Sequence, residues 1–192
     1  MNTEAPPQEN GPEGLLTAED LERALPSAVE IPDDMALRFL DSGEELYSLQ
    51  GLTEEDLEAL YTLGNNLYEA QTYGEAREIF EQLCLLNGSD PRFWFALGCS
   101  LQPLGRHEEA LAAFAMAQSH EEENPLPAYQ AYECHLALGD IATAAKALLL
   151  TVALAKGSSE HASLAKRAAT LLEELETPRV ASTSSQMPEP IS

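Results

Sequence analysis

Basic residues are scarce in this sequence of 192 residues. Ten Lys and Arg stand against 33 Asp and Glu, so the formal net charge is −23. Binding sites for nucleic acids and for anionic membranes need clustered Lys and Arg, and no basic run occurs here. We therefore expect no nucleic-acid partner and no direct membrane binding.

Cysteine and long apolar runs are also sparse. The three cysteines, Cys84, Cys99 and Cys134, are an odd number and are widely spaced among helical residues, which favours reduced packing thiols over a disulfide framework or a redox role. Residues 1–14 lack the basic and apolar regions of a secretory signal, and no apolar run approaches 18 residues. We therefore expect a cytoplasmic protein.

The sequence has no pattern typical of catalysis or of metal binding. Cys134 and His135 are neighbours, and neighbouring side chains on a helix point about 100° apart, so they do not form a thiolate–imidazole pair. The histidines show no ligand spacing with the cysteines, and neither a Gly-rich phosphate loop nor a nucleophile elbow occurs. We expect no enzyme, no cofactor and no metal.

What the sequence does have is a repeat of 34 residues, the length of a tetratricopeptide repeat (TPR). Residues 57–90, 91–124 and 125–158 align without a gap. The first two units share a pattern of small and large residues: Leu60-x2-Leu63-Gly64-x2-Leu67 with Ala76-x3-Phe80, and Trp94-x2-Leu97-Gly98-x2-Leu101 with Ala110-x3-Phe114. The third unit keeps Ala144-x3-Leu148 but has Tyr132 in place of the glycine, so its local packing must open.

The segments outside the repeats are assigned from composition. Residues 1–14, an acidic tail, and residues 177–192 hold few large apolar groups, so we expect both to be disordered. Residues 15–56 are predicted to form an N-terminal helical segment, and residues 159–176 an amphipathic capping helix. The predicted fold is all-α: a TPR superhelix of three tandem helix-turn-helix repeats, with N-terminal helices and a C-terminal capping helix.

Several strings resemble a known family over the segment from about Met35 to Leu175. They include Leu60-Tyr61-Thr-Leu-Gly64, Tyr73-Gly-Glu-Ala76, Asp90-Pro-Arg92-Phe93, Gln102 before Leu104-Gly105, and Glu133-Cys134-His135-Leu136-Ala-Leu-Gly-Asp140. With them the chain is similar to the class II, or translocator, chaperones of bacterial type III secretion systems. The sequence departs from that family in its first thirty or so residues and at Pro103, which should tighten or end a helix.

The resemblance implies a function. Members of this family are cytoplasmic bacterial proteins that bind a pair of hydrophobic, pore-forming translocators through extended N-terminal segments and keep them soluble before secretion. It also implies a candidate homodimer through the region before the first repeat, here residues 35–49. The alternative for these residues is docking on the first repeat of their own chain.

The helical period assigns positions 2, 5, 9 and 12 of each unit to one face of its first helix, and the resemblance identifies this face as the concave groove. The candidate peptide-binding residues are Tyr61, Asn65, Tyr68, Arg92, Phe95, Cys99, Gln102, Tyr129, Glu133 and Leu136. Aromatic rings with amide groups suit an extended apolar peptide. The alternative is that the four aromatic residues only pack between neighbouring helices.

A second function remains open at this point: a general TPR scaffold or adaptor that assembles a complex by gripping an acidic tail, with a regulatory role in some cases. Such a grip needs several basic residues in the groove. Of the twelve positions only Arg92 is basic, against Glu58 and Glu133, so the chaperone hypothesis is preferred.

Overall fold

A computed structural model describes residues 46–176 of the chain. The predicted tails, residues 1–14 and 177–192, and most of the predicted N-terminal segment, residues 15–45, lie outside the described residues. The described residues contain helices and no strand, which confirms the all-α prediction for this part of the chain. The chain divides into two compact units, residues 1–59 and 60–192.

The described part of the first unit holds the short helix α3, Leu46–Leu49, and the start of α4, Glu54–Glu69. Thr53 and Asp56 cap α4 reciprocally. The Asp56 backbone N–H donates to Thr53 Oγ1 at 3.2 Å, and the Thr53 N–H donates to Asp56 Oδ2 at 2.8 Å. Hydrogen bonds from Thr53 hold the pKa of Asp56 below its ordinary value. The helix therefore begins where the sequence offers this capping pair.

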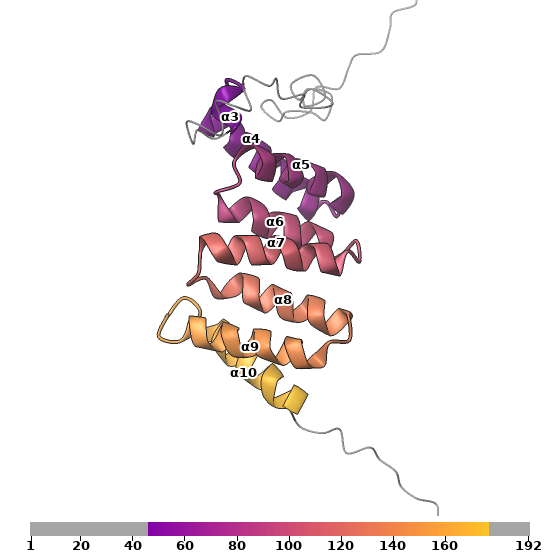
Figure 1. Ribbon diagram of the computed structural model, residues 1–192, viewed down its shortest axis with the longest axis vertical. Coiled ribbons are helices and arrows are strands. Elements are labelled where there is room, and N and C mark those ends of the chain that lie inside the picture. The colour runs from indigo at the N-terminus through magenta and orange to yellow at the C-terminus, as the bar shows by residue number, and fades with distance from the viewer. Residues whose placement is uncertain (1–45, 177–192) are drawn as a thin grey trace, which may run out of the picture. The chain divides into compact units, whose positions relative to one another are not determined.

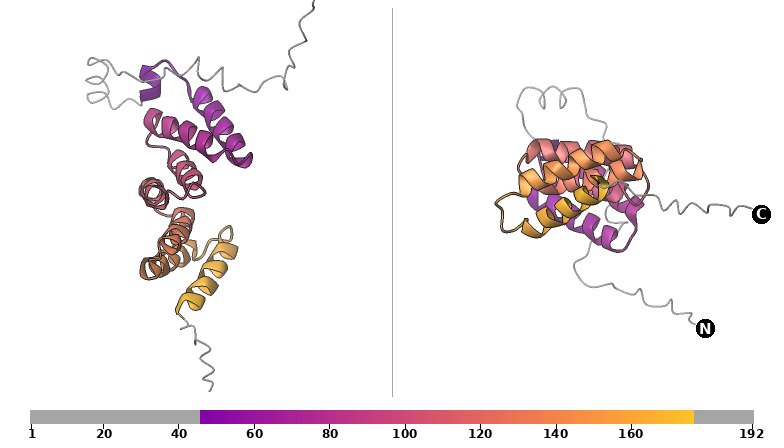
Figure 2. Two further views of the ribbon diagram at one scale, coloured as in Figure 1. Left: turned by 90° about the vertical axis from the view of Figure 1, so that its right-hand side faces the viewer. Right: turned by 90° about the horizontal axis from the view of Figure 1, so that it is seen from below.

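The second unit stacks its helices in chain order, each packed on the next (Figure 1). After α4 come α5 Tyr73–Leu86, α6 Pro91–Leu101, α7 His107–His120, α8 Pro125–Ala137, α9 Ile141–Ala155 and α10 Ala162–Glu176. Figure 2 shows the same stack from two further sides, with α10 beside α9. The first helices of the repeats are α4, α6 and α8, and the second helices are α5, α7 and α9.

Polar caps fix the starts of the later first helices. Asp90 and Asn124 accept hydrogen bonds from the backbone N–H groups of Arg92 and Leu126, each at 2.9 Å. A proline follows each cap at the first helical position, where a missing N–H costs nothing. The two helices therefore begin at the same position of their repeats.

The turn between the two helices of a repeat has one geometry in all three repeats. Gln71, Gly105 and Gly139 occupy the same position and have φ values of 64°, 74° and 78°. The backbone N–H of the next residue reaches back to the first helix in each case: Thr72 to Leu67, Arg106 to Leu101 and Asp140 to His135, at 2.9 to 3.1 Å. Glycine takes this left-handed conformation without strain, whereas Gln71 adopts it at a cost.

Pro103 shortens α6. Helices α4 and α8 end at position 13 of their repeats, whereas α6 ends two positions earlier, at Leu101. Proline has no N–H to donate, and its ring crowds the carbonyl four residues earlier, so the helix cannot continue through it. The turn at Gly105 keeps the geometry of the other repeats, so the change stays local.

The two helices of a repeat meet where an aromatic ring lies on a glycine. A Cβ atom at Gly64 would lie 2.6 Å from Phe80 Cε1, and one at Gly98 would lie 2.5 Å from Phe114 Cε1. Both phenylalanine side chains are buried. These distances leave no room for a methyl group, so the glycines set how closely the helices approach.

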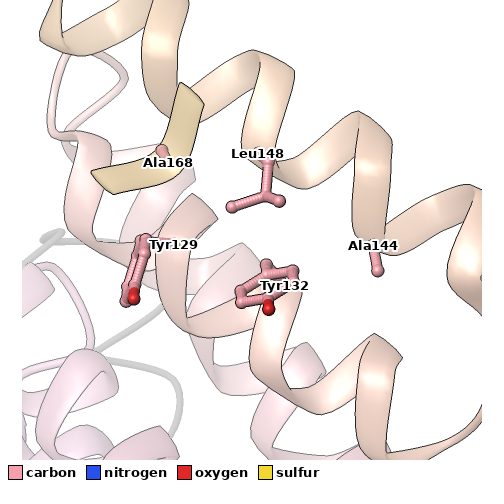
Figure 3. Close-up of a cluster of buried hydrophobic side chains, with 5 residues drawn as sticks. All are labelled: Tyr129, Tyr132, Ala144, Leu148 and Ala168. Atoms are coloured by element: carbon pink, nitrogen blue, oxygen red, sulfur yellow. The ribbon is translucent and has the colours of Figure 1, made fainter. Parts of the chain in front are cut away.

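The third repeat reverses this arrangement. Tyr132 occupies the glycine position on α8, and the smaller Leu148 occupies the phenylalanine position on α9. Both side chains are buried in one cluster with Tyr129, Ala144 and Ala168 (Figure 3). The space that Tyr132 needs is therefore made by the smaller partner across the helix pair.

We predict that Gly98→Ala lowers the free energy of unfolding by about 1 to 3 kcal/mol, because the new methyl group overpacks against Phe114. Urea unfolding followed by circular dichroism measures this. Gly74→Ala is the matched control: apart from its chain neighbours and the backbone of its own helix, no atom lies within 4 Å of its Cβ position, and alanine favours a helix by up to about 1 kcal/mol. Equal effects of the two changes would contradict the glycine–ring account.

Candidate functional site

The ten candidate residues differ in exposure. Tyr68, Arg92, Glu133 and Leu136 are exposed. Half-buried side chains are those of Tyr61, Asn65, Phe95, Cys99 and Gln102, and Tyr129 is buried, with 8% of its surface exposed. We call the nine candidates other than Tyr129 the first-helix wall. All of them lie on α4, α6 or α8 except Gln102, which directly follows α6.

At the α4 end of the wall, aromatic rings and one cation lie together. The Tyr61 ring centroid is 5.9 Å from that of Phe80 and 5.6 Å from that of Phe93. The guanidinium carbon of Arg92 lies 5.3 Å from the Tyr61 centroid, and Arg92 Nη2 is 2.7 Å from Asp90 Oδ2. Tyr61 thus combines both interpretations: it packs between helices and keeps an accessible part under Arg92.

The centre of the wall brings together groups from four helices. Burial raises the pKa of Tyr68 on α4, with further contributions from Cys99 on α6, Tyr73 on α5 and Glu133 on α8. The Tyr68 ring lies 5.3 Å from that of Tyr73, in an edge-to-face arrangement. Cys99 and Glu133, which lie 31 and 65 residues after Tyr68 in the sequence, therefore both contribute to the raised pKa of this exposed tyrosine.

Gln102 links α6 to α8. Its Nε2 donates to the backbone oxygen of Gln130 at 3.3 Å and to Cys134 Sγ at 3.4 Å. Gln102 is a candidate peptide-binding residue, but its amide N–H group already joins two repeats. Gln102 therefore orders the wall itself.

Phe95 packs against an aromatic ring of its own repeat. Its ring centroid is 5.7 Å from that of Phe114, the ring that also covers Gly98. The side chain is only half-buried, so one part supports the helix pair and another part faces outward. An alanine at this position would change both the packing and the surface.

Tyr129 is the one candidate peptide-binding residue that the structure buries. Its ring lies 5.9 Å from that of Tyr132, inside the buried cluster that includes Leu148 and Ala168 (Figure 3). The guanidinium carbon of Arg167 lies 5.9 Å from the Tyr129 centroid. Helix α10 therefore covers this tyrosine, and Tyr129 takes the packing role that was the alternative for the aromatic residues.

The three thiols are disfavoured as nucleophiles by their surroundings. Burial raises the pKa of Cys84 and of Cys99 to about 12, with smaller contributions from acidic side chains and, for Cys99, from Cys134. Burial also raises the pKa of Cys134, although the hydrogen bond from Gln102 opposes the shift. Their protonated form is favoured at neutral pH, and the thiolate is the reactive form.

Among residues 46–176, no three His, Cys, Asp or Glu side chains gather as metal ligands. Within the same range, none of the helices has the length and apolar character of a membrane span.

The sequence of this chain is similar to those of known proteins. The tetratricopeptide repeat family matches residues 91–119. Low calcium response locus protein H of Yersinia pestis is 30% identical over 135 residues, which are 70% of this chain and 80% of that protein. These matches confirm the predicted TPR fold.

Two solved structures are similar over most of their length. PcrH, which is from Pseudomonas aeruginosa, in complex with the chaperone binding region of PopD is 38% identical, with a TM-score of 0.64 over 65% of this chain and 94% of PcrH. The type III secretion translocator chaperone SycD of Yersinia enterocolitica, in an alternative dimer, is 30% identical, with a TM-score of 0.62 over 64% of this chain and 93% of SycD.

We predict that iodoacetamide at pH 8 alkylates Cys84, Cys99 and Cys134 more than tenfold more slowly in the folded protein than in urea, because their raised pKa values leave little thiolate. Mass spectrometry of tryptic peptides over time measures each site, and the protein in urea supplies the reference rate. A single cysteine that reacts as fast in the folded protein as in urea would contradict this.

Proposed function

The chain belongs to the family of type III secretion translocator chaperones that includes PcrH and SycD, and we propose on this premise that it holds hydrophobic translocator proteins until they are secreted. The held part is an extended segment near the N-terminus of a translocator. Binding keeps the translocator soluble and competent for secretion in the bacterial cytoplasm. The proposal draws support from PcrH, which is 38% identical and is solved with the chaperone binding region of PopD.

One observation carries the proposal: the wall presents exposed apolar groups from separate repeats. Tyr68 on α4 is 37% exposed and Leu136 on α8 is 39% exposed, and both occupy position 12 of their repeats. Cys99 lies on α6, the first helix between α4 and α8; it is half-buried and contributes to the raised pKa of Tyr68. An extended peptide that crosses the first helices meets one apolar contact from each repeat it passes.

The energetic logic favours an apolar segment rather than an acidic tail. Arg92 is already paired with Asp90 at 2.7 Å and lies over Tyr61, so it adds little net positive charge to the wall. Glu133 is exposed on the same surface. A tail with several carboxylates would lose hydration here without enough cations to offset it, which argues against the adaptor alternative.

The pKa shifts of the side chains at the site also favour binding over catalysis. Tyr68, Cys99 and Cys134 all have raised pKa values, chiefly because burial disfavours their charged forms. A nucleophile or a general base needs the opposite shift or a partner that takes its proton. We therefore propose a non-enzymatic role that needs no cofactor.

We keep homodimer formation through residues 35–49 as part of the proposal. The described end of this segment is α3, where Leu46 is buried. SycD, a member of the same family, is solved as a dimer, which supports an assembly of two copies. The competing arrangement is docking of these residues on their own chain.

We predict that Tyr68→Ala combined with Leu136→Ala weakens binding of a translocator's N-terminal segment at least thirtyfold, because loss of two apolar contacts at an interface costs about 2 kcal/mol or more. Both side chains are already exposed, so the melting temperature should change little. Fluorescence anisotropy with labelled N-terminal peptides of the host's translocators measures the affinity.

The matched control changes two exposed leucines of second helices, Leu85→Ala with Leu149→Ala. These residues are 64% and 52% exposed, on α5 and α9. The control should keep wild-type affinity. If instead it loses affinity while the Tyr68 and Leu136 variant keeps it, the second helices carry the binding and the wall assignment is wrong.

A further inference from the structure

The 34-residue register does not stop at the third repeat. Continued from residue 125, it makes Ser159 a first position and places α10 where a fourth first helix would stand. The packing agrees: α10 packs on α9 as α8 packs on α7 and α6 packs on α5. Helix α10 therefore extends the row formed by α4, α6 and α8.

Burial at position 10 fixes how α10 is turned. This position holds Ser100 on α6, Cys134 on α8 and Ala168 on α10, and all three side chains have 0% of their surface exposed. Ala168 lies in the cluster with Tyr129 and Tyr132, and four leucines of α10 pack against the same cluster: Leu164, Leu171, Leu172 and Leu175. The rotation of α10 about its axis thus matches that of the two helices before it.

The next row, position 9, then runs along the wall onto α10. It holds Asn65, Cys99, Glu133 and finally Arg167, which is exposed. The guanidinium carbon of Arg167 lies 5.9 Å from the centroid of the buried Tyr129 ring. Stacking on this ring holds the Arg167 cation at the α10 end of the extended surface. The same surface carries the apolar side chains of Tyr68 and Leu136.

The two arginines of this extended surface differ in what they already bind. Arg92 is paired with Asp90 at 2.7 Å, whereas no salt bridge of the described residues includes Arg167. Glu133 and Glu174 contribute to the raised pKa of Tyr132 and Arg167 opposes them, so these three charged groups surround the same tyrosine. In the position-9 row, Glu133 repels a ligand carboxylate and Arg167 attracts one.

We propose that Arg167 binds a single carboxylate, an Asp or Glu side chain of the held translocator segment, and so fixes the register and direction in which that segment crosses the wall. This inference rests on the proposed chaperone function and deepens it. An apolar segment alone could slide along the wall or bind in reverse, since apolar contacts are not directional. One charge-assisted pair at the α10 end removes that ambiguity, because the planar guanidinium matches a carboxylate in geometry as well as in charge.

The test is a double-mutant cycle with the full chain. Labelled peptides that tile the N-terminal regions of the host's translocators are titrated by fluorescence anisotropy, and each Asp or Glu of the peptides that bind is replaced by its amide. One replacement should weaken binding to the wild-type protein about tenfold, the effect of losing a hydrogen-bonded charge pair. The same replacement should have no effect on the Arg167→Gln protein.

Two further variants separate charge recognition from packing. Lys166→Gln removes the same charge from the neighbouring exposed residue of α10, about 100° around the helix, and should leave the coupling intact. Arg167→Glu should bind a peptide whose acidic residue is changed to Lys better than it binds the original peptide. This rescue would not occur if Arg167 only supported Tyr129.

The outcomes distinguish this inference from the proposed function. If wild-type protein binds peptides but Arg167→Gln weakens acidic and amide peptides equally, Arg167 is only a packing residue and the inference is overturned. If no carboxylate replacement matters to the wild-type protein, it is overturned as well. If no peptide from any translocator binds the wild-type protein, the proposed function itself fails, and the inference fails with it.

Discussion

An aromatic ring seated on a glycine backbone sets the geometry of the first two repeats, with Phe80 on Gly64 and Phe114 on Gly98. At this distance the facing sides of both helices are closed to anything larger than the ring, so other side chains must turn toward the neighbouring repeat or away from the stack. Positions 9 and 12 of the first helix are among those that turn away, whereas the position-5 rings of Tyr61, Phe95 and Tyr129 pack against neighbouring rings. The binding surface is thus a consequence of the packing rule.

The third repeat shows that the rule concerns the shared volume rather than the residue types. Tyr132 replaces the glycine and Leu148 replaces the phenylalanine, and the pair remains buried. Enlargement on one helix is compensated by reduction on the other, as expected for a close-packed interior that tolerates exchange at constant volume. The same exchange brings the Tyr132 ring against Tyr129.

Much of this could be predicted from the sequence because the information is local and periodic. Glycine and phenylalanine at fixed spacing predict the helix pairs, and Asp90 and Asn124 before prolines mark where helices begin. The burial of Tyr129 could not be predicted in the same way, because it depends on α10, which lies some 40 residues further along the chain. Arg167 is absent from the predicted site because the sequence pattern predicts α10 only as a capping helix. Continuing the 34-residue count by one unit places Arg167 in the position-9 row.

The proposed function requires that the first helices, and not the second, receive the translocator segment. Hydrogen–deuterium exchange of the full chain, with and without a bound N-terminal segment of a translocator, tests this directly by mass spectrometry of peptides from each helix. We expect slower exchange in α4, α6 and α8 on binding, with little change in α5, α7 and α9. Protection confined to the second helices would contradict it.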